Sequence, residues 1–112
     1  MHTFTSNSSV TINAVTQETG VVRGEIYNAV VGKIAEGYVN IEATFVKDED
    51  GTPVHHQHFQ VSEADMNTFE GTQTLTGTTC FGKWGELCSL YVISQLGGLW
   101  GLATTDWTLA EH

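Results

Sequence analysis

Apolar and polar residues alternate with a period of two through the first half of the chain, a pattern typical of strands with one buried face. The alternation is cleanest over residues 38–47. The residues that follow, 48–53, are rich in turn formers and predict a hairpin onto a second strand over residues 54–61. The apolar positions of the first of these strands are expected to face the core: Val39, Ile41, Ala43 and Phe45.

Two earlier segments carry the same alternation. Residues 9–16 predict a half-buried strand, the polar residues 17–20 predict a turn, and residues 21–31 predict a second strand. Residues 1–8 are small and polar, so we expect them to form a flexible N-terminal arm. Residues 9–112 are then expected to form one globular domain.

The pattern changes at Ser62, where a short helix is predicted. Ser62 is followed by Glu63 and Asp65, a combination typical of a helix N-cap with acidic residues in the first turn. Gly71 predicts the end of this helix. The serine therefore marks the start of a helical C-terminal half.

A longer helix is predicted over residues 84–96, with Gly97 and Gly98 supplying a left-handed C-cap. A short final strand is predicted over residues 107–110. Together these elements predict an α+β fold, with an antiparallel sheet or small sandwich of about five to six strands. One short and one longer helix are expected in the C-terminal half.

The longer predicted helix is apolar nearly all round, unlike a surface helix, which would have a polar face. One side is expected to pack on the sheet and the other to meet another subunit, because a domain of this size has little material to enclose it. The alternative is a helix wholly enclosed in its own monomer. The candidate interface residues are Trp84, Leu87, Leu90, Tyr91, Ile93, Leu96, Leu99 and Trp100.

The charge balance disfavours two classes of partner. The 112 residues include 13 acidic and 4 basic side chains, a formal charge of −9, and the basic residues stand singly, so direct nucleic-acid binding is not expected. Residues 81–103 are strongly apolar, but Lys83 and Glu86 interrupt them, and no membrane span is expected.

The N-terminus does not resemble a signal peptide, so Cys80 and Cys88 are expected to be thiols.

Three of the five histidines lie within residues 55–58. On a strand, His56 and His58 share one face and His55 lies on the other. An H-x-H pair can hold one metal ion through two imidazoles, but the site needs a third ligand. His56 and His58 are therefore the candidate metal ligands, and a polar sheet face without a metal is the competing interpretation.

These histidines belong to an ordered set of residues: Gly51, His56, His58, Glu63 and Gly71. The set resembles the first motif of the cupin family, in which two histidines and a glutamate bind a metal inside a jelly-roll barrel. The resemblance implies a metal-binding β-domain or a cupin-like enzyme using His56 and His58. The family's second motif has no counterpart, because the one later histidine is His112.

No other segment predicts catalytic chemistry. The sequence lacks a G-x-S-x-G elbow, a glycine-rich phosphate loop and a C-x-x-C pair. We therefore expect a non-enzymatic protein with no catalytic residues and no cofactor. A further alternative is a β module that binds a small ligand or carbohydrate on Trp84, Trp100 or Trp107.

Two segments, residues 9–22 and 98–109, resemble small virion structural proteins of tailed bacteriophages. The first has a strand, a polar turn and a restarting strand, and the second follows a serine-capped helix. The resemblance implies a self-assembling subunit of the capsid surface, neck or tail. Its implied partners are copies of itself and other virion proteins, and its implied location is the virion, after synthesis in the host cytoplasm.

Overall fold

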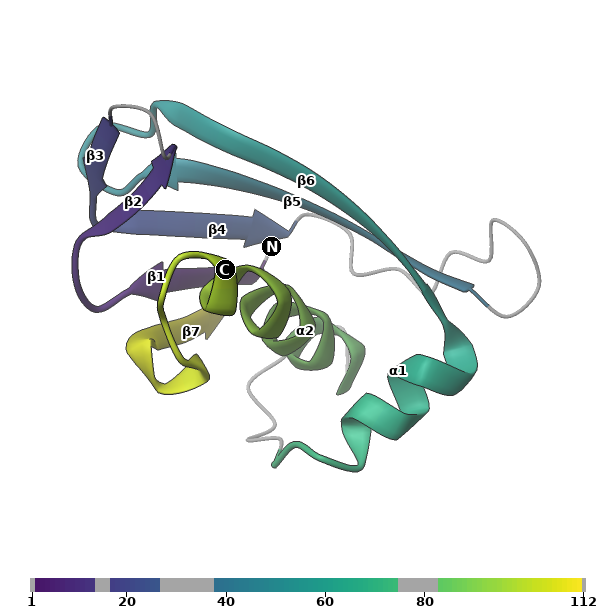
Figure 1. Ribbon diagram of the computed structural model, residues 1–112. Coiled ribbons are helices and arrows are strands. Elements are labelled where there is room, and N and C mark those ends of the chain that lie inside the picture. The colour runs from purple at the N-terminus through teal and green to yellow at the C-terminus, as the bar shows by residue number, and fades with distance from the viewer. Residues whose placement is uncertain (1, 14–16, 27–37, 75–82, 112) are drawn as a thin grey trace.

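The protein is described by a computed structural model over residues 2–13, 17–26, 38–74 and 83–111, and it has an α+β fold (Figure 1). The elements in chain order are β1 (His2–Ser6), β2 (Val10–Asn13), β3 (Gln17–Gly20), β4 (Val22–Ile26), β5 (Tyr38–Lys47), β6 (Pro53–Ser62), α1 (Glu63–Glu70), α2 (Lys83–Leu99), a 3₁₀ turn (Thr104–Asp106) and β7 (Trp107–Glu111). Five strands form an antiparallel sheet in the order β6-β5-β4-β1-β7, and β2 pairs with β3 in a small second sheet. The predicted fold class is confirmed.

The hairpin of β5 and β6 forms the longest part of the sheet, as predicted. Lys47 and Gly51 close its turn by backbone hydrogen bonds, and a bulge between Phe45 and Val46 shifts the register of the two strands. The four residues expected to face the core are all fully buried: Val39, Ile41, Ala43 and Phe45. The period-two alternation therefore identified the inner face of β5 correctly.

Residues 2–6 are not a flexible arm, which corrects the prediction for residues 1–8. They form β1, which pairs with β4 on one side and with β7 on the other. Phe4 is fully buried, with its ring centroid 5.5 Å from that of Phe45 and 5.5 Å from that of Trp107. The polar side chains of β1 suggested an exposed arm, but most of them are buried, and strands on both sides supply backbone partners for β1.

Residues 17–20 also differ from the prediction, because they form strand β3 instead of a turn. The Thr19 hydroxyl donates to the carbonyl of Val10 and accepts from the amide of Ile12, so a polar side chain holds β3 to β2. Gly20, with φ 76°, then redirects the chain. Of the strands predicted over residues 9–16 and 21–31, residues 10–13 and 22–26 are observed, and residues 14–16 and 27–31 lie outside the described part.

The short helix α1 begins and ends where predicted. The Ser62 hydroxyl accepts a hydrogen bond from the amide of Asp65 at 3.1 Å, and Gly71 follows the last helical residue. An N-cap of this kind satisfies an amide that has no partner within the helix. The predicted final strand is also observed, as β7.

The longer helix α2 is one turn longer than predicted, because Gly97 and Gly98 are helical instead of capping it. The amide of Trp100 still donates to the carbonyl of Leu96 at 2.9 Å, and the residue with left-handed backbone is Gly101, with φ 75°. The stop glycine therefore lies three residues beyond the predicted pair. α2 packs across one face of the sheet, next to β1 and β7 (Figure 1).

Candidate functional site

The face of α2 predicted to meet another subunit is largely used inside the monomer. Leu87, Ile93 and Leu96 have exposed fractions of 0%, 1% and 6%, and all three belong to the core cluster. Buried in this way, these three side chains offer little surface to a second copy. Leu90 is half-buried. The enclosed helix, weighed as the alternative, describes these three residues correctly.

Two aromatic candidates are half-buried and also have partners within the chain. The ring of Tyr91 lies 5.8 Å from that of Phe59 and 5.4 Å from that of Phe69. The ring of Trp100 lies 4.8 Å from that of Phe45. Both are packed edge to face, an arrangement that stabilises a core margin. The side chains of the remaining candidates lie outside the described part: Trp84 and Leu99.

Trp107 is 5% exposed, so it offers no stacking platform to a carbohydrate. Among the described residues, the large apolar side chains classed as exposed are Val21 and Tyr38. Two scattered side chains do not make an apolar docking patch. Any self-association surface on the described part of the chain is therefore built from other groups.

The histidines of β6 lie as the alternation predicted. His56 and His58 are exposed on the outer face of the sheet, away from α2, whereas His55 is half-buried on the inner face. The His55 ring lies 5.8 Å from that of Trp100, and its Nε2 lies 3.2 Å from Oε1 of Gln57. His55 is thus part of the core margin, and the other two imidazoles remain available to a ligand.

The register of β5 and β6 gives each outer histidine a specific neighbour. His58 lies opposite Glu42, and His56 lies opposite Thr44. Nδ1 of His56 is 3.0 Å from the Thr44 hydroxyl, a contact that orients the imidazole. Glu42 is the carboxylate nearest in register to the histidine pair, and sequence reasoning missed it because it belongs to the other strand of the hairpin.

A single chain does not complete a metal site in the part that the structure describes, since no group of three ligating side chains gathers there. Glu63, the glutamate of the cupin-like set, begins α1, and the sheet is open instead of being closed into a jelly-roll barrel. The outer face of the hairpin thus carries two histidines and one carboxylate that do not form a three-ligand group within the described part of one chain.

The edge of β6 is the second feature of this site. Within the described ranges, β6 pairs with β5 on one side and has no strand on the other, and it forms one margin of the sheet (Figure 1). Its ten residues, PVHHQHFQVS, include no lysine, arginine, aspartate or glutamate. Natural edge strands are commonly protected by charged side chains, bulges or short length. β6 is long and carries none of these charges, and its proline and its bulge, at Pro53 and Val54, both lie at one end, so residues 55–62 form an edge without these protections.

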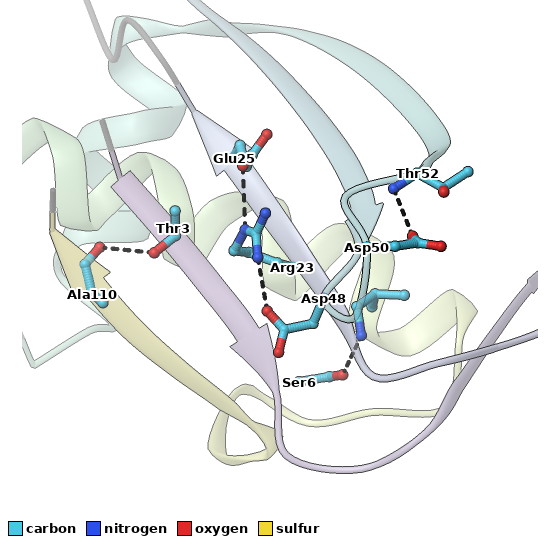
Figure 2. Close-up of polar contacts among 9 residues, drawn as sticks. Thr3, Ser6, Arg23, Glu25, Asp48, Asp50, Thr52 and Ala110 are labelled. Carbon is cyan, nitrogen blue, oxygen red and sulfur yellow. Dashed lines mark hydrogen bonds and ion pairs between the residues drawn. The ribbon is translucent and has the colours of Figure 1, made fainter.

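A group of ion pairs lies at the other end of the outer face (Figure 2). Arg23 Nε contacts Glu25 Oε2 at 3.2 Å, and Arg23 Nη1 contacts Asp48 Oδ1 at 2.8 Å. Asp50 accepts a hydrogen bond from the amide of Thr52, and hydrogen bonds from Thr52 hold the pKa of Asp50 below its ordinary value. These contacts fix the β5–β6 turn against β4, which is a structural role.

Cys88 has no catalytic environment. Its side chain is fully buried on α2, and burial raises the pKa of its thiol to about 12. A thiol with that pKa is protonated at neutral pH and is a poor nucleophile. Cys80 lies outside the described part.

The sequence predicts that the apolar segment 81–103 does not span a membrane. Within the described ranges, no helix combines the length and apolar character needed to cross a bilayer. Most of the segment is α2, which packs on the sheet.

Comparison with protein families, with curated proteins and with solved structures finds no match. Function is therefore inferred from the residues of the chain and their arrangement.

Proposed function

We propose that the protein is a non-enzymatic structural subunit that assembles with copies of itself through the edge of β6. The observation that supports this proposal is the ten-residue edge strand without charged side chains. Such an edge presents a row of backbone donors and acceptors to a second strand. Backbone pairing replaces the apolar helix interface as the means of assembly, since Leu87, Ile93 and Leu96 are already buried within the described part of that helix.

Two copies would meet around a two-fold axis perpendicular to the sheet. Identical strands related by such an axis run antiparallel, so β6 of one copy pairs with the same strand of the other. Residues of equal parity then face the same side of the joined sheet. With Gln57 on the axis, the register places Gln57 opposite its own copy, and the two five-stranded sheets become continuous.

The setting we propose is the virion of a tailed bacteriophage, as the resemblance of residues 9–22 and 98–109 implies. A subunit repeated in a symmetric particle needs at least one surface that recognises another copy. A formal charge of −9 would also keep such a subunit from adhering to packaged DNA. Other virion proteins are the additional partners in this proposal.

The test compares the chain with Gln57→Lys by analytical ultracentrifugation over a wide range of concentrations, in buffer with chelator and in buffer with zinc. Two lysines directly opposite across the axis would repel each other and weaken pairing. Asn67→Lys is the matched control, because it adds the same charge at an exposed position on α1. We expect the chain and Asn67→Lys to dimerise and Gln57→Lys to remain monomeric.

Circular dichroism establishes that each variant is folded. Because Gln57 is half-buried, Gln60→Lys serves as a second edge variant at an exposed position. A chain that stays monomeric at all concentrations in both buffers overturns the proposal. An assembly that neither edge variant weakens would also overturn it.

A further inference from the structure

We propose that two β6 edges together form a binding site for a divalent transition-metal ion such as Zn²⁺. The ligands are Glu42 and His58 of one copy and His56 of the partner subunit. This inference rests on the proposed pairing of β6 strands. It gives the outer histidines a role that a single chain does not provide.

The ligands come together because of the register. Within one chain, Glu42 lies directly across from His58 on the outer face. With Gln57 on the two-fold axis, His56 of the partner subunit lies directly across from His58 on its other side. Neighbouring strands are about 4.8 Å apart, so the three Cα atoms form a row about 10 Å long with His58 at its centre. Two-fold symmetry produces a second, identical row.

This row suits a metal better than the two histidines of one strand do. The Cα atoms of residues i and i+2 of a strand, such as His56 and His58 of one chain, are about 6.6 Å apart along the strand. Directly opposed residues on neighbouring strands have Cβ atoms about 4.5–5.5 Å apart. Zinc bonds to imidazole nitrogen measure about 2.0–2.1 Å, so the opposed pair converges on an ion more easily. Two imidazoles and one carboxylate are a recognised zinc ligand set, and water can complete the tetrahedron.

The hydrogen bond of His56 prepares its ring for this role. When Nδ1–H donates to the Thr44 hydroxyl at 3.0 Å, Nε2 carries the lone pair. Metal-binding histidines usually donate their second ring N–H to a neighbouring acceptor, which fixes both tautomer and orientation. Thr44 is thus a positioning residue, and it lies on the strand next to the ligand that it orients.

The same geometry distinguishes the proposed register from its neighbours. If His56 lay on the two-fold axis, His58 would lie opposite Val54 of the partner subunit. If His58 lay on the axis, His56 would lie opposite Gln60 of the partner subunit. Only the register centred on Gln57 places both histidines of each copy opposite histidines. A bound ion would therefore select one of the registers that backbone pairing alone allows, as single buried polar groups do in coiled coils.

The experiment measures dimerisation in chelator and in zinc. Metal that binds only the dimer must tighten it, and we expect the dimer dissociation constant to fall roughly tenfold or more with saturating zinc. His56→Gln and His58→Gln are expected to dimerise like the parent chain in chelator and to lose the zinc effect. His55→Gln is the matched control, because it removes an imidazole from the inner face and should retain the effect.

Isothermal titration with zinc gives a second measurement. We expect one zinc ion per chain, and a roughly 10- to 100-fold weaker zinc affinity for Thr44→Val, the range typical of lost hydrogen bonds to metal ligands. Thr44→Ser should restore the affinity, since it keeps the hydroxyl.

The outcomes separate this inference from the assembly on which it rests. A dimer that forms in chelator and is unchanged by zinc overturns the metal site and leaves the assembly intact. Zinc binding that survives His56→Gln or His58→Gln also overturns the site. A chain that is monomeric in both buffers overturns both proposals.

Discussion

At the scale of single residues, the closest packing constraint in the sheet is between Phe4 and Gly24, which are opposite each other on β1 and β4. A Cβ atom added at Gly24 would overlap the Phe4 ring. That ring is fully buried between Phe45 and Trp107, so it has little room to move. The core therefore has room for the Phe4 ring because Gly24 has no side chain.

Gly24→Ala is expected to destabilise the protein by about 1–3 kcal/mol, the usual cost of overpacking a core. The free energy of unfolding is measured by urea titration followed by circular dichroism. Gly71→Ala is the control, because Gly71 has right-handed helical backbone and an added Cβ there meets only an ordinary contact at 3.4 Å. It should leave stability unchanged or raise it slightly. Equal effects of the two changes would contradict the packing described for Gly24.

The faces of the histidines could be predicted from sequence, and their neighbours could not. Alternation alone assigned His56 and His58 to one face and His55 to the other, because side chains of a strand change sides at every residue. The pairings with Glu42 and Thr44 depend on the register, which the turn and the bulge at Phe45 set. A bulge leaves no reliable sign in the pattern of apolar residues, so the carboxylate and the orienting hydroxyl emerged only from the structure.

At the scale of elements, β1 shows why a short polar strand is not recognised from its sequence pattern. Its five residues contain one large apolar side chain, too few to display a period of two. Its neighbours β4 and β7 supply hydrogen bonds on both sides, so its position in the sheet decides its structure. The longer β5 has enough alternating positions to be recognised alone. Sequence patterns therefore predicted β5, β6, the helices and several shorter strands, but missed β1 and β3, which depend on distant or side-chain hydrogen bonds.

Deleting residues 2–6 is expected to abolish cooperative folding. The deletion removes the strand between β4 and β7, together with a buried phenylalanine whose loss alone costs about 3–5 kcal/mol. Typical domains are stable by about 5–15 kcal/mol in total. Thermal unfolding followed by circular dichroism should show no sigmoidal transition. As a control, glycine at both exposed positions Ser8 and Ser9 should preserve the transition. A folded deletion variant would instead support the flexible arm.

At the scale of the whole molecule, the formal charge of −9 opposes assembly even though β6 contains no lysine, arginine, aspartate or glutamate. Two negatively charged copies brought edge to edge repel each other, and salt reduces this repulsion at distances beyond the Debye length. The Debye length is about 30 Å at 0.01 M salt and about 8 Å at 0.15 M. Ionic strength should therefore control the affinity of the dimer without changing its contacts.

We expect the dimer dissociation constant, measured in chelator, to decrease as salt rises over this range. Sedimentation equilibrium at several salt concentrations provides the measurement. Glu49→Lys, at an exposed turn position, reduces the net negative charge and should make the dissociation constant less sensitive to salt. A dimer that weakens as salt is added would indicate contacts between opposite charges, contrary to pairing through backbone hydrogen bonds.

The pairing of β1 with β7 has a consequence for how the protein is made. His2 lies opposite Glu111, so β1 pairs with a strand that the ribosome releases long after it. Until translation reaches residue 107, the ring of Phe4 lacks its contact with the indole of Trp107, and β1 lacks the hydrogen bonds that β7 provides. Translation must therefore pass residue 111 before β1 can complete its pairing in the sheet.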